Sequence, residues 1–160
     1  MTDIRIIPAS EEHVAIACDI AIKAWTPIRE VFRRDLGDEL YDAFFADWQA
    51  EKRASAERIM RTERAYVAVL DGTVVGFVSY RILEGTKCGV VSLNAVDPEY
   101  RGMGIAPQMY NFVLEKMREE GMLYAKVHTG LDDGHAPARR AYQKVGFEKN
   151  LPSVDYYMKL

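Results

Sequence analysis

The sequence predicts an α/β (α+β) fold in which a mixed, mostly antiparallel, twisted sheet of six or seven strands carries helices on both faces. Apolar residues first recur at helical spacing, and three strand-like runs follow at residues 65–70, 73–82 and 88–96. The dipeptide Asp71-Gly72 between the first two runs is typical of a hairpin turn. We therefore expect three consecutive antiparallel strands in the middle of the chain.

The first third of the chain predicts one strand and two helices. Alternation over residues 4–8 indicates a strand, and Ser10 is expected to cap the helix that follows. Pro27 is expected to interrupt that helix, because proline lacks the N–H that the helix needs. Residues 40–48 have the spacing of a second amphipathic helix, which the charged stretch 51–64 prolongs or follows.

The last third predicts a helix that begins near Gly104 and ends at Gly121, because glycine is the usual residue just beyond a helix. A further strand is expected over residues 122–128, and a further helix over residues 136–145. Residues 147–160 predict two terminal strand segments. These segments complete the expected sheet.

Composition indicates one soluble domain that spans residues 1–160. The 21 basic and 24 acidic residues give a net charge of −3, which disfavours a nucleic-acid surface. Cys18 and Cys88 cannot build a disulfide framework, so reduced thiols and a cytoplasmic location are expected. We expect no signal peptide and no membrane partner, since the longest stretch without Asp, Glu, Lys or Arg is 13 residues, 102–114.

The segment that joins the third middle strand to the next helix has the chemistry of a phosphate-binding loop. Gly102 and Gly104 allow backbone N–H groups to approach a ligand, and the start of a helix adds free donors that favour an anion. The alternative is a tight turn without a ligand. A dinucleotide fingerprint would need glycine where Pro107 stands, and a Walker loop would need Gly-Lys before Ser or Thr, so these nucleotide-binding classes are disfavoured.

Residues 96–106 resemble the acetyl-CoA signature of the GNAT superfamily of N-acetyltransferases, which has the pattern Q/R-x-x-G-x-G/A. Its fixed positions are filled by Arg101, Gly104 and Ala106. Residues 138–147 resemble the family's helix with a tyrosine, here Tyr142, four residues before Gly-Phe. The order of the expected elements also resembles the GNAT fold.

The resemblance implies an enzyme that transfers an acetyl group from acetyl-CoA to a primary amine of a small molecule or peptide by direct attack on the thioester, without a metal. It also implies a sheet that splays beside Val96, whose N–H would polarise the thioester carbonyl. The implied coenzyme contacts are Asn94, Ala95, Val96, Arg101, Gly102, Met103, Gly104, Ile105, Ala106, His135, Ala138 and Tyr142. An acyl-CoA-binding sensor without turnover remains the alternative, and a homodimer is left open.

Tyr142 is expected to be the catalytic residue that gives a proton to the leaving thiolate, because the two groups have similar pKa values. Packing of its ring on the sheet is the alternative. His135 stands where the family commonly carries asparagine, and one ring nitrogen could replace that contact to the coenzyme arm. A metal site made of His128, Asp132, Asp133 and His135 is disfavoured, because no fixed zinc spacing is met and Asp-Asp-Gly is typical of a solvated turn.

The base that takes the proton of the amine is left unassigned, although Glu30 is a candidate. Arg29, Arg33 and Arg34 could clamp a carboxylate of an amino-acid-like acceptor. Acidic residues follow at once, however, so an exposed face of mixed charge is the alternative. Amino acids, polyamines, aminoglycosides and peptide N-termini all remain open as acceptors.

Overall fold

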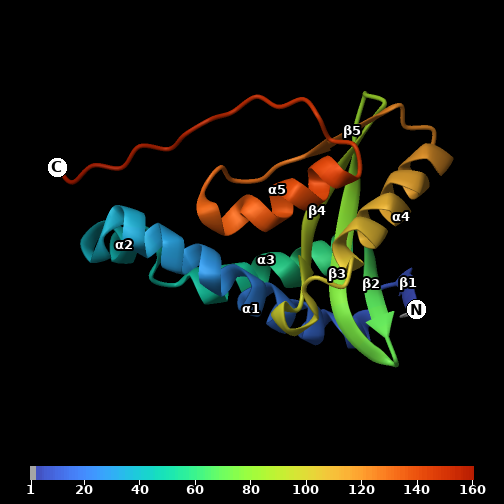
Figure 1. Cartoon of the computed structure of the whole chain (residues 1–160), viewed down its shortest axis with the longest axis horizontal. Coiled ribbons are helices and arrows are strands. Elements are labelled where there is room, and N and C mark those ends of the chain that lie inside the picture. Colours follow the sequence, from blue (N-terminus) through green and yellow to red (C-terminus); the bar gives the residue numbers. More distant parts are fainter. Residues whose placement is uncertain (1–2) are drawn as a thin grey trace.

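The computed structural model describes residues 3–160, and a five-stranded sheet lies at its centre (Figure 1). The strands lie in chain order, β1 to β5, so each pairs with its neighbour in sequence. The first four are antiparallel, and β4 and β5 are parallel. Their bounds are β1 Ile4–Pro8, β2 Arg64–Leu70, β3 Thr73–Leu83, β4 Cys88–Val96 and β5 Tyr124–Val127. The antiparallel middle of the sheet is thus as the sequence predicted.

Helices cover both faces of the sheet, as predicted. Helices α1 and α3 pack on one face, and α4 and α5 pack on the other (Figure 1). Helix α2 lies beyond the sheet, next to the far end of α1 (Figure 1). The helices are α1 Glu11–Leu36, α2 Asp38–Phe45, α3 Trp48–Thr62, α4 Ile105–Glu119 and α5 Ala136–Lys144, with 3₁₀ turns η1 Pro98–Tyr100 and η2 Asp133–His135.

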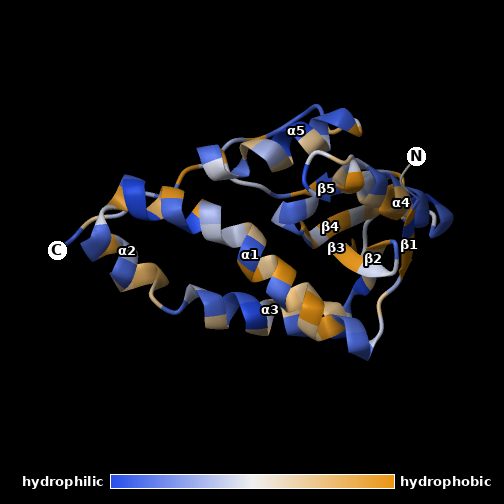
Figure 2. Ribbon diagram, turned by 60° about the horizontal axis from the view of Figure 1, so that its bottom comes forward, coloured by the Kyte–Doolittle hydropathy of each residue, from blue (hydrophilic) through white to orange (hydrophobic). Residues whose placement is uncertain are grey.

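Strand alternation divides the buried side chains between two cores. Val67 and Phe77 lie in the cluster with α1 and α3, whereas their neighbours Ala68 and Val78 lie in the cluster with α4 and α5. Successive side chains of a strand point to opposite faces, so β2 and β3 supply both cores at once. Figure 2 shows that the strands and the sheet-side ends of α1 and α3 are mainly hydrophobic. The central strands are therefore fixed from both sides.

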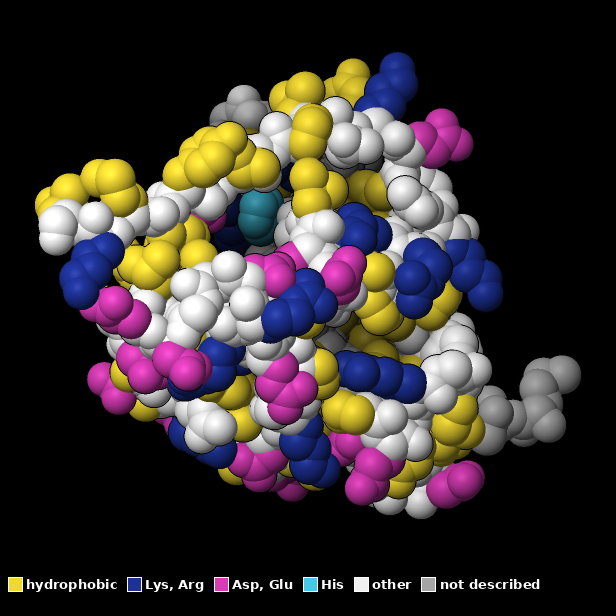
Figure 3. Space-filling view, turned by 60° about the vertical axis from the view of Figure 1, so that its left-hand side comes forward, with side chains coloured by type: hydrophobic (Ala, Val, Ile, Leu, Met, Phe, Trp, Pro, Cys, Tyr) yellow, Lys and Arg dark blue, Asp and Glu magenta, His cyan; other side chains and the backbone are white. Residues whose placement is uncertain are grey.

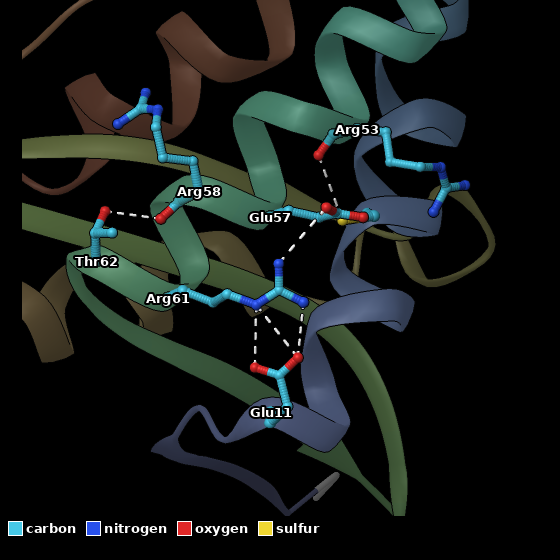
Figure 4. A network of polar contacts seen from close by, with 7 residues as sticks. Glu11, Arg53, Glu57, Arg58, Arg61 and Thr62 are labelled. Carbon is cyan, nitrogen blue, oxygen red and sulfur yellow. Dashed lines mark hydrogen bonds and ion pairs between the residues drawn. The ribbon is translucent and has the colours of Figure 1, made fainter.

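Ion pairs align α1 and α3, and Figure 4 shows those at the sheet-side end of α3. Arg61 of α3 binds Glu11 of α1 at 2.7 Å and lies 3.6 Å from Glu57 on its own helix. Arg53 and Asp19 pair the two helices again at 2.7 Å. Exposed pairs of this kind contribute about 0–1 kcal/mol each, so they set the alignment of the helices more than their stability.

The prediction that Pro27 interrupts the first helix is wrong. Helix α1 continues through Pro27 to Leu36. Ala24 and Ile28 on either side are buried against the rest of the molecule, whereas Pro27 itself is exposed. Packing of the two flanking turns holds the helix together. Because Pro27 is on the exposed side, water can reach the backbone carbonyl that has lost its N–H donor.

The predicted terminal strands are also wrong, so the sheet has five strands and not six or seven. Residues 147–160 contain no strand and form an arm that runs from α5 toward α2 (Figure 1). Tyr157 packs edge-on against Phe44 of α2 at 4.9 Å, and Lys159 pairs with Glu39. Pro152 lacks the N–H of a ladder, and aromatic contacts with α2 hold this segment away from β5. Within residues 3–160, no helix has the length and apolarity needed to cross a membrane.

Candidate active site

The loop between β4 and α4 is held at its start by Asp97, which is buried. Its carboxylate accepts a hydrogen bond from the Glu99 N–H at 3.1 Å and pairs with Lys23 Nζ of α1 at 3.0 Å. Burial alone would raise the pKa of Asp97, but these two contacts outweigh it and lower that pKa. The carboxylate is therefore ionised at neutral pH, and it ties the loop to α1.

Two glycines give this loop a shape that most residues do not adopt. Gly102 and Gly104 have φ angles of 79° and 72°, in the left-handed region. A Cβ atom at either position would meet no heavy atom within 4 Å. The glycines are thus required by backbone conformation and leave open space beside the loop. The N–H groups at the start of α4 follow directly, so the loop is a cradle suited to an anion.

The pairing between β4 and β5 ends before β4 does, as the expected splay of the sheet requires. Their register pairs end at Val91 with Val127, whereas β4 continues to Val96. A bulge lies at the same point, because Ser92 and Leu93 together oppose Ser79 of β3. The Ser79 hydroxyl donates to the Leu93 carbonyl at 3.1 Å and fixes the bulge. The last residues of β4 therefore have no strand partner on the β5 side within the described chain.

Three polar side chains meet beside this gap. Tyr110 of α4 donates to Asn94 Oδ1 at 2.7 Å, and Asn94 Nδ2 donates to the hydroxyl oxygen of Tyr142 at 3.0 Å. The alternative bond from Tyr142 to Asn94 Oδ1 is 3.4 Å, too long to be strong. The hydroxyl proton of Tyr142 thus remains available to another acceptor.

The environment of Tyr142 keeps its hydroxyl neutral. Burial raises the pKa of Tyr142, and the hydrogen bond from Asn94 offsets part of that rise. A neutral phenol can donate a proton, whereas a phenolate cannot. The sequence did not point to Tyr110, which orients Asn94 from sixteen residues away. Only its burial on the sheet side of α4 could have marked it.

The remaining predicted coenzyme contacts differ in exposure. Arg101 and Met103 are exposed beside the two glycines, as a ligand contact requires. Ile105 is buried in the core, so only its backbone faces the loop. Ala106 and Ala138 are half-buried. Ala138 lies on α5 four residues before Tyr142, and one helical turn therefore places the two on the same face.

His135 forms a close pair with Asp132 at the start of α5. Its Nδ1 lies 2.6 Å from Asp132 Oδ2, and its backbone N–H donates to Asp132 Oδ1 at 3.2 Å. Arg139 fixes the same loop through the Gly130 and Asp132 carbonyls, at 2.7 and 2.8 Å. With Nδ1 donating to the carboxylate, Nε2 of His135 keeps a free lone pair. The sequence favoured a solvated turn for Asp132, so its pairing with His135 was not predicted.

The pair is pressed against α1. A Cβ atom on Gly134 would lie 2.9 Å from the Ile28 Cα, so glycine is needed for this close approach. The His135 ring lies 6.4 Å from the ring of Phe32. No group of three or more His, Cys, Asp or Glu side chains within residues 3–160 is arranged to hold a metal. The structure thus gives no support to a metal site around His128 and His135.

The three arginines that the sequence grouped as a clamp have different surroundings. Arg33 binds Asp38 and Asp42, each at 2.7 Å. Arg34 binds Asp35 at 2.7 Å and Asp133 at 3.2 Å. Arg29 has no carboxylate within 4.0 Å among the described residues and is enclosed by aromatic rings. Glu30, the candidate base, is exposed on α1.

Residues 25–147 match the acetyltransferase (GNAT) family. This chain belongs to that family. The sequence-based identification of a GNAT domain is thereby confirmed, and with it the assignment to acyltransferases. An N-acetylaspartate synthetase from Rattus norvegicus is 33% identical over 93 residues, which are 58% of this chain and 30% of that protein. The GNAT chain therefore matches less than a third of this relative's length.

Solved structures share the GNAT fold. PaiA N-acetyltransferase from Thermoplasma acidophilum, in complex with coenzyme A, aligns with a TM-score of 0.71 over 91% of this chain and 90% of that chain, at 18% identity. A GNAT-family acetyltransferase from Staphylococcus aureus aligns with a TM-score of 0.69 over 96% and 95%, at 15% identity. At such identities the likeness shows a shared fold and nothing beyond it.

Proposed function

We propose that this GNAT domain transfers the acetyl group of acetyl-CoA to a primary amine of a small molecule or peptide by direct attack on the thioester. The observation that carries the proposal is the gap between β4 and β5, beside which Asn94 binds Tyr142 and after which β4 leads into the glycine loop. We assign the diphosphate to the glycine loop, the extended amide chain to the free edge of β4, and proton donation to Tyr142. Similarity to an N-acetylaspartate synthetase and to the fold of PaiA N-acetyltransferase supports N-acetyl transfer.

Each part of acetyl-CoA has a matching surface in this site. The diphosphate binds the N–H groups between Arg101 and Ala106, where no side chain crowds the glycines. The pantetheine arm pairs with the unpartnered edge of β4 at Asn94 and Ala95, and His135 of η2 and Ala138 of α5 are its proposed further contacts. The N–H near Val96 donates to the thioester carbonyl oxygen.

The chemical step forms one bond, breaks one bond and transfers two protons. The amine nitrogen attacks the carbonyl carbon, the C–N bond forms, and the C–S bond breaks. Tyr142 gives its hydroxyl proton to the departing thiolate and regains a proton from solvent after the thiol leaves. The nitrogen loses its surplus proton to a base. Cys18 is buried and has no role in this step.

His135 is the base in this proposal. Asp132 occupies Nδ1, so the lone pair on Nε2 can accept the proton of the amine. A carboxylate behind a histidine is the arrangement that holds the ring in the correct tautomer and stabilises its protonated form. The alternative role, predicted from the sequence, is a contact to the coenzyme arm through the same nitrogen.

The substitution His135→Asn separates the two roles of His135. Asparagine is the residue that the family commonly carries at this position, so it can keep a coenzyme contact but cannot serve as a base. We expect kcat to fall by about 10²–10⁴-fold, with acetyl-CoA affinity unchanged by calorimetry. A variant with the kcat of the wild type would make His135 a coenzyme contact and return the base to solvent.

Thiol release from acetyl-CoA tests the proposed function itself. The wild-type chain is incubated with a panel of amino acids, polyamines, aminoglycosides and peptides, and free coenzyme A is measured with a thiol reagent. We expect release that depends on one class of amine, with mass spectrometry showing the acetylated product. Tight acetyl-CoA binding without release for any amine would instead identify an acyl-CoA sensor.

A further inference from the structure

The cations between α1 and α3 differ in how they are neutralised. Arg61, at the sheet-side end of α3, binds Glu11 of α1 (Figure 4), and Arg53 binds Asp19 of α1. Arg29 of α1 and Lys52 of α3, the residue before Arg53, have no ion pair or hydrogen bond to a carboxylate among residues 3–160. Two positive charges therefore face the same interhelical region without a counter-charge.

Arg29 is surrounded by aromatic rings. Its guanidinium carbon lies 4.8 Å from the ring centre of Phe45, 5.2 Å from that of Phe32 and 5.5 Å from that of Trp48. Its Nε is buried and has no hydrogen-bond partner among the described residues. Burial lowers the pKa of Arg29, and Glu51, Tyr41 and Tyr157 offset this only from longer range. An unpaired buried donor on a charged group is unfavourable until an acceptor arrives.

Lys52 repeats this arrangement from the opposite helix. Its Nζ lies 4.0 Å above the ring of Trp25, while Arg29 lies over Trp48, four residues before Lys52. Burial and the nearby charge of Arg29 lower the pKa of Lys52 to about 8. The ammonium thus has neither full hydration nor a carboxylate. A bound anion would relieve both deficits at once.

This region adjoins the proposed base. The ring of Phe32 contacts Arg29 on one side and lies 6.4 Å from the ring of His135 on the other. Figure 3 shows this side of the molecule, where the surface is hollowed and where a histidine and basic side chains lie among hydrophobic ones. A small acceptor that reaches Nε2 of His135 with its amine can therefore extend toward Arg29.

We infer that Arg29 and Lys52 form a carboxylate-binding site, and that the amine acceptor of this GNAT domain is an amino acid or another small amine that carries a carboxylate. The inference rests on the proposed function and adds the chemical class of its acceptor. A guanidinium binds a carboxylate through two parallel N–H donors, which gives both affinity and orientation. Arg33 and Arg34 are excluded from this role, since their charges are already neutralised. The surrounding rings exclude water from the ion pair.

Matched acceptors test the inference. Each of the common amino acids is compared with its own carboxamide, which keeps the size and the amine but removes the negative charge. We expect the wild type to acetylate the best amino acid with a kcat/KM about 10- to 100-fold above that of its amide, the range for a charge-assisted contact. An equal rate with the amide would overturn the carboxylate site while leaving N-acetyl transfer in place.

Single-residue variants then test which side chains cause the preference for the amino acid over its amide. Arg29→Gln and Lys52→Gln, on separate helices, are each expected to raise KM for the amino acid about 10- to 100-fold and to leave the amide unchanged. Arg33→Gln is the matched control, because it removes a neutralised arginine one turn further along α1, and its preference should equal that of the wild type. Thermal melts identify any variant that fails to fold. If Arg29→Gln or Lys52→Gln fails to fold, the other variant, on the other helix, provides the test.

A failure of the proposed acetyl transfer can be distinguished from a failure of the carboxylate site. If no amine releases thiol, calorimetry of the coenzyme A-loaded chain with the same amino acids and amides still measures the carboxylate site. Binding of the amino acids alone, lost in Arg29→Gln, would support the site without turnover. Equal binding of both probes, or undiminished amino-acid binding in both variants, would overturn it.

Discussion

Replacing Gly104 by glutamate is expected to weaken acetyl-CoA binding by about 1,000-fold. A carboxylate about 4 Å from the diphosphate is repelled by about 4 kcal/mol at the effective dielectric of a protein surface, which corresponds to a factor near 10³. The φ of 72° at this position adds strain for any residue with a side chain. Isothermal titration calorimetry with acetyl-CoA measures the loss directly.

The control for this prediction is Gly104→Ala, which carries the backbone strain without the charge. No heavy atom lies within 4 Å of the Cβ position, so alanine meets strain of about 1–2 kcal/mol and no collision. Its effect on coenzyme affinity should stay near tenfold. A folded Gly104→Glu variant that binds acetyl-CoA as tightly as the wild type would show that the diphosphate lies elsewhere.

Replacing Tyr142 by phenylalanine is expected to lower kcat by about 10²–10⁴-fold, which equals roughly 3–5 kcal/mol of transition-state stabilisation. The substitution keeps the ring and its contact with Tyr110, at 4.8 Å between centroids, and removes only the hydroxyl. Acetyl-CoA affinity should therefore change little. The measurements are steady-state turnover with a responsive amine and calorimetry with the coenzyme.

Tyr110→Phe is the matched control, because it removes a buried hydroxyl from the same cluster. Tyr110 supports Tyr142 through Asn94 and through ring contact, which phenylalanine keeps, so the loss of its hydroxyl should lower kcat by less than about tenfold, below the range of a direct proton donor. A Tyr142→Phe variant that retains at least about a third of kcat would assign Tyr142 to packing. Loss of coenzyme affinity with kcat intact would make its hydroxyl a binding contact.

Local patterns were sufficient to predict the part of the fold to which we assign the coenzyme. Strand β4 has the predicted bounds, residues 88–96, because turn residues border an apolar run on both sides. The loop with Gly102 and Gly104 follows, and α4 begins at Ile105 as glycine and proline placement predicted. These elements depend on residues that are close in sequence.

The errors arise where distant packing decides the outcome. Burial of Ala24 and Ile28 carries α1 through Pro27, and contacts with Phe44 hold Tyr157 away from the sheet. Propensity alone contains neither contact. The terminal segment had the composition of a strand, but a strand also needs a free edge within reach and an unbroken row of donors.

The candidate site shows the same division. The motif residues from Arg101 to Ala106 and Tyr142 could be named from spacing, and the structure places Tyr142 against Asn94 of β4, beyond the last β4–β5 pair. The sequence could not show that Arg29 lacks a counter-charge. All three arginines lie near acidic residues in the sequence, but only Arg33 and Arg34 form ion pairs with them. Only the three-dimensional arrangement shows which arginine is already paired.

The narrow junction between β4 and β5 determines how the molecule opens. Four register pairs hold β5 to the sheet, and its other edge has no strand neighbour among residues 3–160. Local opening at such an edge requires less free energy than global unfolding, so amide hydrogens of β5 exchange with solvent ahead of those in β3. Because α5 follows β5 in the chain, a coenzyme that contacts both β4 and α5 bridges the two parts that separate. Its binding free energy then adds to the stability of this junction, and the C-terminal third becomes more resistant to proteolysis as the coenzyme concentration rises.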